Sequence, residues 1–256
     1  MKRKNLLTAL AASLLLFAFV PAHAQDESPP NIADLWIITV DYPDSAAFEE
    51  AFKSHIAVRK EAGDPRNWQV YTVVAGGNMN TYGLRYCCFK WADADAYTEW
   101  SQSSGIFDDW NANVAQYVDD YSHQFTALDI DNNNWPEDPP DYRYFGITTW
   151  SLKPGTAGSR QAAITALSTV GKEHGWSRPW SWGFRIGGDS ELSLVTPYAD
   201  FAAMEPPEQS FFEFATEHLG AEETTRIFEE FGSSFWSSRY SILEHRPDLS
   251  MGDGED

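Results

Sequence analysis

Two arginines stand inside stretches rich in aromatic residues, and their surroundings suit the binding of an anion. The two-residue period of a strand places Arg185 on one face with Ser181 and Gly183. The same period places Arg85 on one face with Gly83, Cys87 and Phe89. Small neighbours leave room beside a guanidinium, and an arginine shielded from water needs a carboxylate or an anionic ligand. We therefore predict that Arg85 and Arg185 bind a ligand. The alternatives are an internal salt bridge or a side chain that extends to the sheet edge.

His55 and Trp182 complete the predicted ligand-binding set. His55 lies one helical turn before Arg59, where it could act as a base or a haem ligand; a histidine at the boundary of the core is the ordinary alternative. Trp182 offers a ring on which a ligand could stack, and core packing is the alternative for this and the other tryptophans. No local motif predicts a catalytic residue.

Cys87 and Cys88 are the two cysteines of the chain, and they are adjacent. Neighbouring residues in a strand point to opposite faces, and a disulfide between adjacent cysteines needs a strained ring. We therefore expect two buried free thiols that pack as small apolar residues.

Metal ligands are not grouped in the sequence. Asp129, Asp131 and Asn133 have the spacing that begins a calcium-binding loop, but Asn134 and Pro140 replace the glycine and the glutamate that the loop requires. No HExxH or CxxC motif occurs, and the histidines are dispersed. We predict neither a metal site nor a cofactor.

Two similar halves must position these side chains, joined by a segment dense in Asn, Asp and Pro. Each half has a strand, a helix, two strands joined at a Gly-Gly pair, a helical segment and a final strand. The predicted strands are residues 36–42, 68–74, 81–91 and 123–129, and then 144–150, 180–185, 191–198 and 239–244. This order, β-α-β-β-α-β twice, is that of a ferredoxin-like unit and its repeat.

The helices have expected starts and stops. Ser45 is expected to cap the first helix, and Gly63 and Gly175 lie where the first helix of each half should end. The later helical segments are expected near 106–121 and 227–235 from their apolar spacing. Each four-stranded sheet would leave one face bare, so the two sheets are expected to bury those faces against each other.

The boundaries follow from these patterns. The chain is predicted to contain a signal peptide (1–24), an N-terminal tail (25–34), a first unit (35–128), a linker (129–141), a second unit (142–247) and an acidic C-terminal tail (248–256).

The leader and the charge predict the compartment and limit the partners. A basic start at Lys2, Arg3 and Lys4, an apolar run over 6–20 and small residues at Ala22 and Ala24 are typical of a secretory signal. We therefore predict a soluble protein exported to the periplasm or secreted, with no membrane attachment after cleavage. The net charge of −20 argues against binding nucleic acid. A small-molecule ligand is the expected partner, and the protein is expected to be a monomer or a homodimer.

The element order resembles the dimeric α/β-barrel superfamily, in which two ferredoxin-like units pack together and are sometimes fused in tandem. That group includes antibiotic-biosynthesis-type monooxygenases, NIPSNAP-like and EthD-like proteins, and haem proteins such as chlorite dismutase and dye-decolourising peroxidase. The resemblance implies an α+β fold of two tandem βαββαβ units packed as a pseudo-dimeric α/β barrel. It also implies a ligand cavity between sheet and helices or between the sheets. No family residue set carries over, because the resemblance rests on element order.

Three functions remain open from the sequence. The residues favour a protein that binds a small anionic or aromatic ligand in an aromatic-lined cavity. By analogy with the fold relatives, an enzyme is the alternative, either a cofactor-independent monooxygenase-like protein or a haem enzyme. A structural or interaction protein without a ligand is the third possibility.

Overall fold

A computed structural model describes residues 28–252, so the predicted signal peptide lies outside the described residues. The first half contains the strands β1 (Ile32–Thr39), β2 (Gln69–Ala75), β3 (Thr81–Phe89) and β4 (Asp120–Leu128) and the helices α1 (Ser45–Glu61), α2 (Ala94–Ser103) and α3 (Ile106–Asp109). The second contains β5 (Tyr144–Leu152), β6 (Ser181–Ile186), β7 (Glu191–Tyr198) and β8 (Phe235–His245), with α4 (Ala157–Glu173), α5 (Phe211–Leu219) and α6 (Ala221–Ser233). The repeated β-α-β-β-α-β order is present, with each second helical region divided into separate helices.

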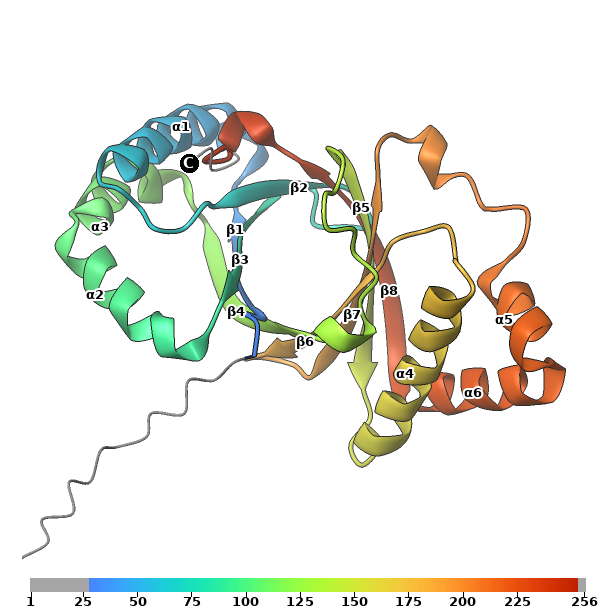
Figure 1. Cartoon of the computed structure of the whole chain (residues 1–256). Helices are drawn as coiled ribbons and strands as arrows, with labels where there is room; N and C mark the ends of the chain where they lie inside the picture. The colour runs from blue at the N-terminus through green and yellow to red at the C-terminus, as the bar shows by residue number, and fades with distance from the viewer. Residues whose placement is uncertain (1–27, 253–256) are drawn as a thin grey trace, which may run out of the picture.

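The strands form a closed antiparallel barrel in the order β1-β3-β2-β8-β5-β7-β6-β4 (Figure 1). Each half contributes four adjacent strands. The halves join where β2 pairs with β8, with Tyr71 opposite His245, and where β4 pairs with β6, with Thr126 opposite Arg185. The predicted α+β barrel class is therefore confirmed. The expectation of two separate sheets stacked face to face is wrong, because the sheets join edge to edge and so satisfy the backbone groups that open edges would expose.

The hydrophobic core lies outside the barrel, between the strands and the helices. In the first half, Phe48 and Phe52 of α1 pack against Ile38, Val70 and Tyr82 on the outer faces of the strands. In the second half, residues of α4 and α6 pack against the outer faces of β5, β6 and β7 in the same way. Figure 1 shows the two groups of helices on opposite sides of the barrel. The bare faces of the two predicted sheets therefore line the barrel interior.

Glycines end two helices as predicted, but the cap of α1 differs. α1 and α4 end at Glu61 and Glu173, and Gly63 and Gly175 follow with φ angles of 69° and 75°, which favour glycine. The prediction that Ser45 caps α1 is wrong, since Ser45 is the first helical residue. A preceding 3₁₀ turn (Tyr42–Asp44) holds Asp44 in a helical conformation, so no side chain caps this end.

The later helical segments begin earlier than predicted. α2 and α5 lie before the predicted segments, and Tyr121 and Phe235 belong to β4 and β8. Where a helix meets a strand, the apolar residues fit both the helical and the strand period, so the predicted helical segments extended into β4 and β8.

The predicted linker packs against the second unit. It begins with a 3₁₀ turn (Ile130–Asn132), and the Trp180 Nε1 atom donates a hydrogen bond to the Asn132 carbonyl at 2.8 Å. Asn134 forms a β-bridge with Trp180, and the Lys172 ammonium donates to the Asp131 carbonyl. The first part of the linker is therefore packed against the second unit, whereas residues 137–140 are exposed.

The chain ends are also more structured than predicted. Ile32 and Ala33, assigned to the N-terminal tail, begin β1 and are buried. Leu249, assigned to the acidic tail, is 1% exposed and packs into the cluster around Phe48, because its apolar side chain covers the end of that core. No helix among residues 28–252 has the length and apolarity needed to cross a membrane.

Gly171 in α4 supplies a test of this packing. A Cβ atom at Gly171 would lie 2.8 Å from the Trp180 ring, whereas one at Gly158 of the same helix would meet nothing within 4 Å. We expect Gly171→Ala to lower the free energy of unfolding by about 1–3 kcal/mol through overpacking. Gly158→Ala should raise it by up to about 1 kcal/mol through helix propensity. Urea denaturation measures both, and equal stabilisation by the two substitutions would contradict the packing described.

Candidate functional site

A cavity of about 1610 Å³ occupies the barrel interior. Side chains from all eight strands line it, together with the linker and the segment after β8. Because side chains alternate along a strand, each strand turns every second residue into this space. Gly83, Arg85, Gly183 and Arg185 all line the cavity, as alternation along each strand requires for residues on one face, and the two glycines leave it open beside the arginines. Phe89, expected on the same face as Arg85, does not line the cavity, because the pairing register shifts at Cys88.

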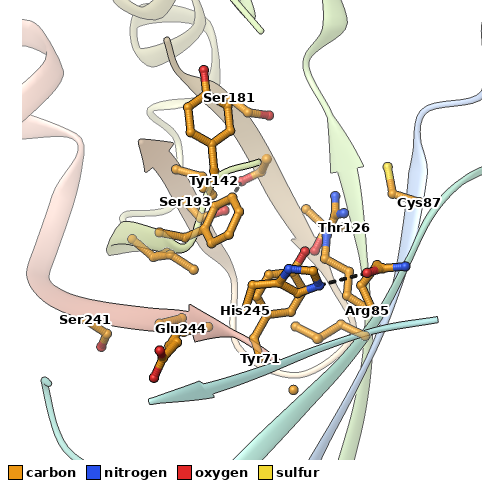
Figure 2. A pocket seen from close by; sticks show the side chains of 18 of the residues that line it. Tyr71, Arg85, Cys87, Thr126, Tyr142, Ser181, Ser193, Ser241, Glu244 and His245 are labelled. Carbon is orange, nitrogen blue, oxygen red and sulfur yellow. Dashed lines mark hydrogen bonds between the residues drawn. The ribbon is translucent and has the colours of Figure 1, made fainter. Parts of the chain in front are cut away.

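Arg85 is the most unusual group in the cavity. It lies opposite Leu35 on β1 and Gln69 on β2. Its guanidinium forms no hydrogen bond or ion pair with any residue in the described part of the chain. Burial lowers the pKa of Arg85, and only nearby Tyr71 acts in the opposite sense. Figure 2 shows Arg85 beside Tyr71 and His245 on one side of the cavity. An arginine remains charged in proteins, so this position is a cationic site without an anion of its own.

Arg185 differs from Arg85, because it already has a carboxylate partner. Its Nη1 atom lies 2.9 Å from Glu191 Oε2, and Arg239 contacts the other oxygen of Glu191 at 3.1 Å. The Glu191 side chain is 8% exposed. The internal salt bridge left open by the sequence is therefore formed, although the Nε atom of Arg185 stays buried without a partner.

Among the strand side chains that line the cavity, positive charges outnumber negative ones. Arg85, Arg185 and Arg239 line the cavity, against the two carboxylates Glu191 and Glu244. The whole chain has a net charge of −20. Charges enclosed by a low-dielectric wall act more strongly than those in water, so the interior favours an anion even though the surface repels one.

Aromatic rings continue from Arg85 toward the linker. The Tyr71 ring lies 5.2 Å from His245 and 5.3 Å from Phe145, between ring centroids. Phe145 lies 6.4 Å from Trp135 of the linker, with the two rings within 7° of parallel. Gln69 Oε1 is 2.8 Å from the Nε2 atom of His245. These rings and Arg85 belong to one sector of the wall, formed by β3, β2, β8 and β5.

Cys87 and Cys88 form a disulfide, so the prediction of two free thiols is wrong. That prediction assumed neighbouring side chains on opposite faces of a regular strand. The peptide between the two residues is cis, and the pairing register of β1 with β3 shifts between Ile32 and Ala33, which leaves Cys88 without a partner in the ladder. Cys87 lines the cavity near Arg85 (Figure 2).

Trp182 and His55 lie outside the barrel, away from the cavity. Trp182 packs with Trp150 and Phe231 in the second core and donates from Nε1 to the Ser168 hydroxyl at 3.1 Å. His55 is on α1, within the helical layer of the first half, and it is 1% exposed. The structure therefore does not bring these two side chains together with Arg85 and Arg185.

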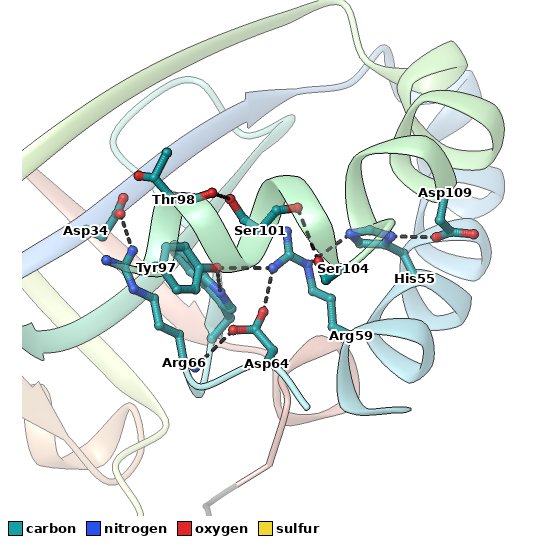
Figure 3. A network of polar contacts seen from close by, with 11 residues as sticks. Asp34, His55, Arg59, Asp64, Arg66, Tyr97, Thr98, Ser101, Ser104 and Asp109 are labelled. Carbon is teal, nitrogen blue, oxygen red and sulfur yellow. Dashed lines mark hydrogen bonds and ion pairs between the residues drawn. The ribbon is translucent and has the colours of Figure 1, made fainter. Parts of the chain in front are cut away.

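His55 belongs to a chain of polar contacts beneath α1 and α2 (Figure 3). Arg59 Nε donates to His55 Nε2 at 2.9 Å, so the ring proton lies on Nδ1, which donates to Asp109 at 2.6 Å. Arg59 also contacts Asp64 at 2.6 Å. Burial lowers the pKa of His55, and the hydrogen bond that His55 donates to Asp109 opposes this shift. His55 is thus a neutral structural histidine whose two ring nitrogens are both occupied.

A second buried ion pair continues this network toward β1. Arg66 contacts Asp34 at 2.6 Å, and Asp34 also accepts a hydrogen bond from His123 at 2.8 Å. The guanidinium of Arg66 lies 3.6 Å from the Tyr97 ring centroid and 4.5 Å from that of Phe89. Cation–π contact and the ion pair together satisfy this arginine, unlike Arg85.

Several cavity residues were missed by the sequence analysis. Tyr71 and Phe145 alternate inward on strands whose period was read correctly, so the signal was present. Glu191 follows Arg185 by six residues across a Gly-Gly turn, a spacing that predicts a cross-strand pair. Trp135 could not be assigned, because its position depends on how the linker packs. Within residues 28–252, no three His, Cys, Asp or Glu side chains are grouped to hold a metal ion.

Solved structures share this fold. A proposed monooxygenase from Lactobacillus acidophilus NCFM has a TM-score of 0.55 over 88% of this chain and 98% of its own, at 12% identity. An anthrone oxidase-like protein has a TM-score of 0.50 over 89% and 96%, at 11% identity. A chlorite dismutase variant from Candidatus Nitrospira defluvii has a TM-score of 0.52 over 87% and 93%, at 6% identity.

These neighbours belong to the dimeric α/β-barrel superfamily and show that the chain has this fold, with both halves in one polypeptide. No protein-family model matches the sequence, and no curated protein is significantly similar to it. At such identities the likeness concerns the fold alone.

His55 predicts a pH dependence of stability. The folded state favours the neutral imidazole, whereas the unfolded chain binds a proton below about pH 6.5. The unfolded state therefore holds more protons as the pH falls, and the free energy of unfolding should decrease between about pH 7 and pH 5. In His55→Gln this part of the decrease should be absent. Urea denaturation across the pH range compares the two slopes, and identical slopes would contradict the assignment.

Proposed function

We propose that this protein binds a small anionic ligand inside the barrel, with Arg85 as its anchor. The observation that carries the proposal is a guanidinium that faces the cavity without a carboxylate partner among residues 28–252. A buried charge is costly unless it is paired, so an anion would supply what the chain does not. Arg66 shows the contrast, since it has both an ion pair with Asp34 and contacts with aromatic rings.

The cavity has room for such a ligand. Its volume of about 1610 Å³ exceeds the roughly 300–1,000 Å³ typical of small-molecule sites. A purely structural role does not require an open interior lined by charged groups, because structural interiors are close-packed. The cavity therefore supports ligand binding over the interaction-only alternative.

A histidine-ligated haem fits the residues poorly. Such a haem needs an imidazole nitrogen that is available to bind the iron. His245 is the one histidine lining the cavity among residues 28–252; it is 2.8 Å from Gln69 Oε1 and has further contacts. In the second half, Trp150, Trp182 and Phe231 fill the space between the strands and the helices. We derive no haem chemistry from this arrangement, and the monooxygenase-like alternative rests on fold analogy alone.

Export of the chain is part of the proposal and rests on the leader. Expressed with residues 1–24 in a Gram-negative host, the protein should appear outside the cytoplasm with Gln25 as its first residue. N-terminal sequencing measures this, and Ala24→Phe should block cleavage, because the peptidase requires a small residue there. Wild-type protein that retains the leader would contradict export.

Arg85 tests the binding proposal directly. Isothermal titration with benzoate, hexanoate and malonate should detect binding of at least one carboxylate to the wild type. Arg85→Gln should weaken that binding by about 10- to 150-fold, the value of one charge-assisted hydrogen bond of roughly 1.5–3 kcal/mol.

The matched control is Lys60→Gln, which removes one positive charge from an exposed position on α1. It should leave the affinity unchanged. No binding of any of the three carboxylates to the wild type, or equal loss in both variants, would overturn the proposal.

A further inference from the structure

The aromatic rings beside Arg85 point to the class of ligand. We infer that the ligand is a planar aromatic carboxylate, with its acid group on Arg85 and its ring against Phe145 and Trp135. The inference rests on the proposed function and deepens it. It makes Trp135, a residue of the linker, a determinant of specificity.

The register of the strands brings the cation and the rings into one sector. Arg85 lies opposite Gln69, two residues before Tyr71, and Tyr71 lies opposite His245. Phe145 follows Tyr144, which pairs with Glu244 next to His245. The wall thus runs from Arg85 past Tyr71 to Phe145, with ring centroids 5.3 Å apart at the last step.

Trp135 extends this wall from outside the strands. It lines the cavity, is 36% exposed, and lies nearly parallel to Phe145. The linker that carries it is held on the second unit, where the Trp182 amide donates to the Asn133 side chain and Asn134 pairs with Trp180. A ring held at a fixed angle beside another ring favours a planar aromatic group by offset stacking or edge contact.

The number of available donors favours a carboxylate over a phosphate. One guanidinium matches the two oxygens of a carboxylate. The other cations that line the cavity are already paired: Arg185 and Arg239 with Glu191, Arg143 with Glu244, and Arg246 with Glu49 and Asp248. A doubly charged phosphate would need further donors, whereas a singly charged acid needs only Arg85.

Three probes of similar size separate the contributions. Benzoate carries a ring and a charge, cyclohexanecarboxylate carries the charge on an aliphatic ring, and benzyl alcohol carries the aromatic ring without the charge. By isothermal titration at pH 7, the wild type should bind benzoate about three- to tenfold more tightly than cyclohexanecarboxylate. Benzyl alcohol should bind more weakly than either acid.

Substitutions at Trp135 test whether this residue causes the preference for benzoate over cyclohexanecarboxylate. Trp135→Leu should bring the ratio of the two acid affinities close to one while cyclohexanecarboxylate binding persists, and Trp135→Phe should restore part of the ratio. Trp236→Leu is the matched control, because Trp236 is 71% exposed and does not line the cavity. Circular dichroism and thermal melts of each variant confirm that it is folded, and Phe145→Leu provides a second variant on the same wall.

The outcomes distinguish this inference from the proposed function. Equal, Arg85-dependent binding of both acids by the wild type would overturn the aromatic preference and leave anion binding intact. A preference for benzoate that survives in both Trp135→Leu and Phe145→Leu would overturn the assigned position of the ring. Absence of binding by either acid would overturn both proposals.

Discussion

The edge-to-edge pairing of the two half-sheets is the constraint on which the rest of the structure depends. β2 with β8 and β4 with β6 convert two open four-stranded sheets into one closed ring. Four strand edges that would otherwise expose unpaired backbone groups thereby find partners. The same closure turns the two bare sheet faces toward each other across an enclosed interior, so the helices need to cover only the outside.

This division explains where the chain keeps its apolar and its charged groups. The large buried rings, such as Phe48, Phe52 and Trp182, pack outside the barrel under helices. The interior is lined by a mixture of glycines, hydroxyl groups, aromatic rings, arginines and aliphatic side chains such as Leu35, Ile37 and Val195, and it remains open over about 1610 Å³. Stability therefore rests on the outer layer, and the inner wall is free to carry chemistry that close packing would exclude.

The environments of three arginines show how the fold treats the same charge differently. Arg66 is satisfied by Asp34 and surrounding rings, and Arg185 is satisfied by Glu191. Arg85 has no such partner in the described part of the chain, although it lines the cavity. The linker adds to this contrast, since it places Trp135 on the ring-lined side of the same cavity.

Strand alternation in the sequence determined that Arg85, Gly83, Arg185 and Gly183 share the inner face, because a two-residue period assigns side chains without any long-range information. The repeated element order likewise determined the fold class. Tertiary structure alone decided that the sheets close into a ring, that no carboxylate of the described residues pairs with Arg85, and that Trp135 reaches the cavity. The same alternation places Trp182, between Ser181 and Gly183, on the outer face of the barrel. His55 joined the helix-covered layer through a contact with Asp109, far along the chain, and a local pattern carries no record of such a contact.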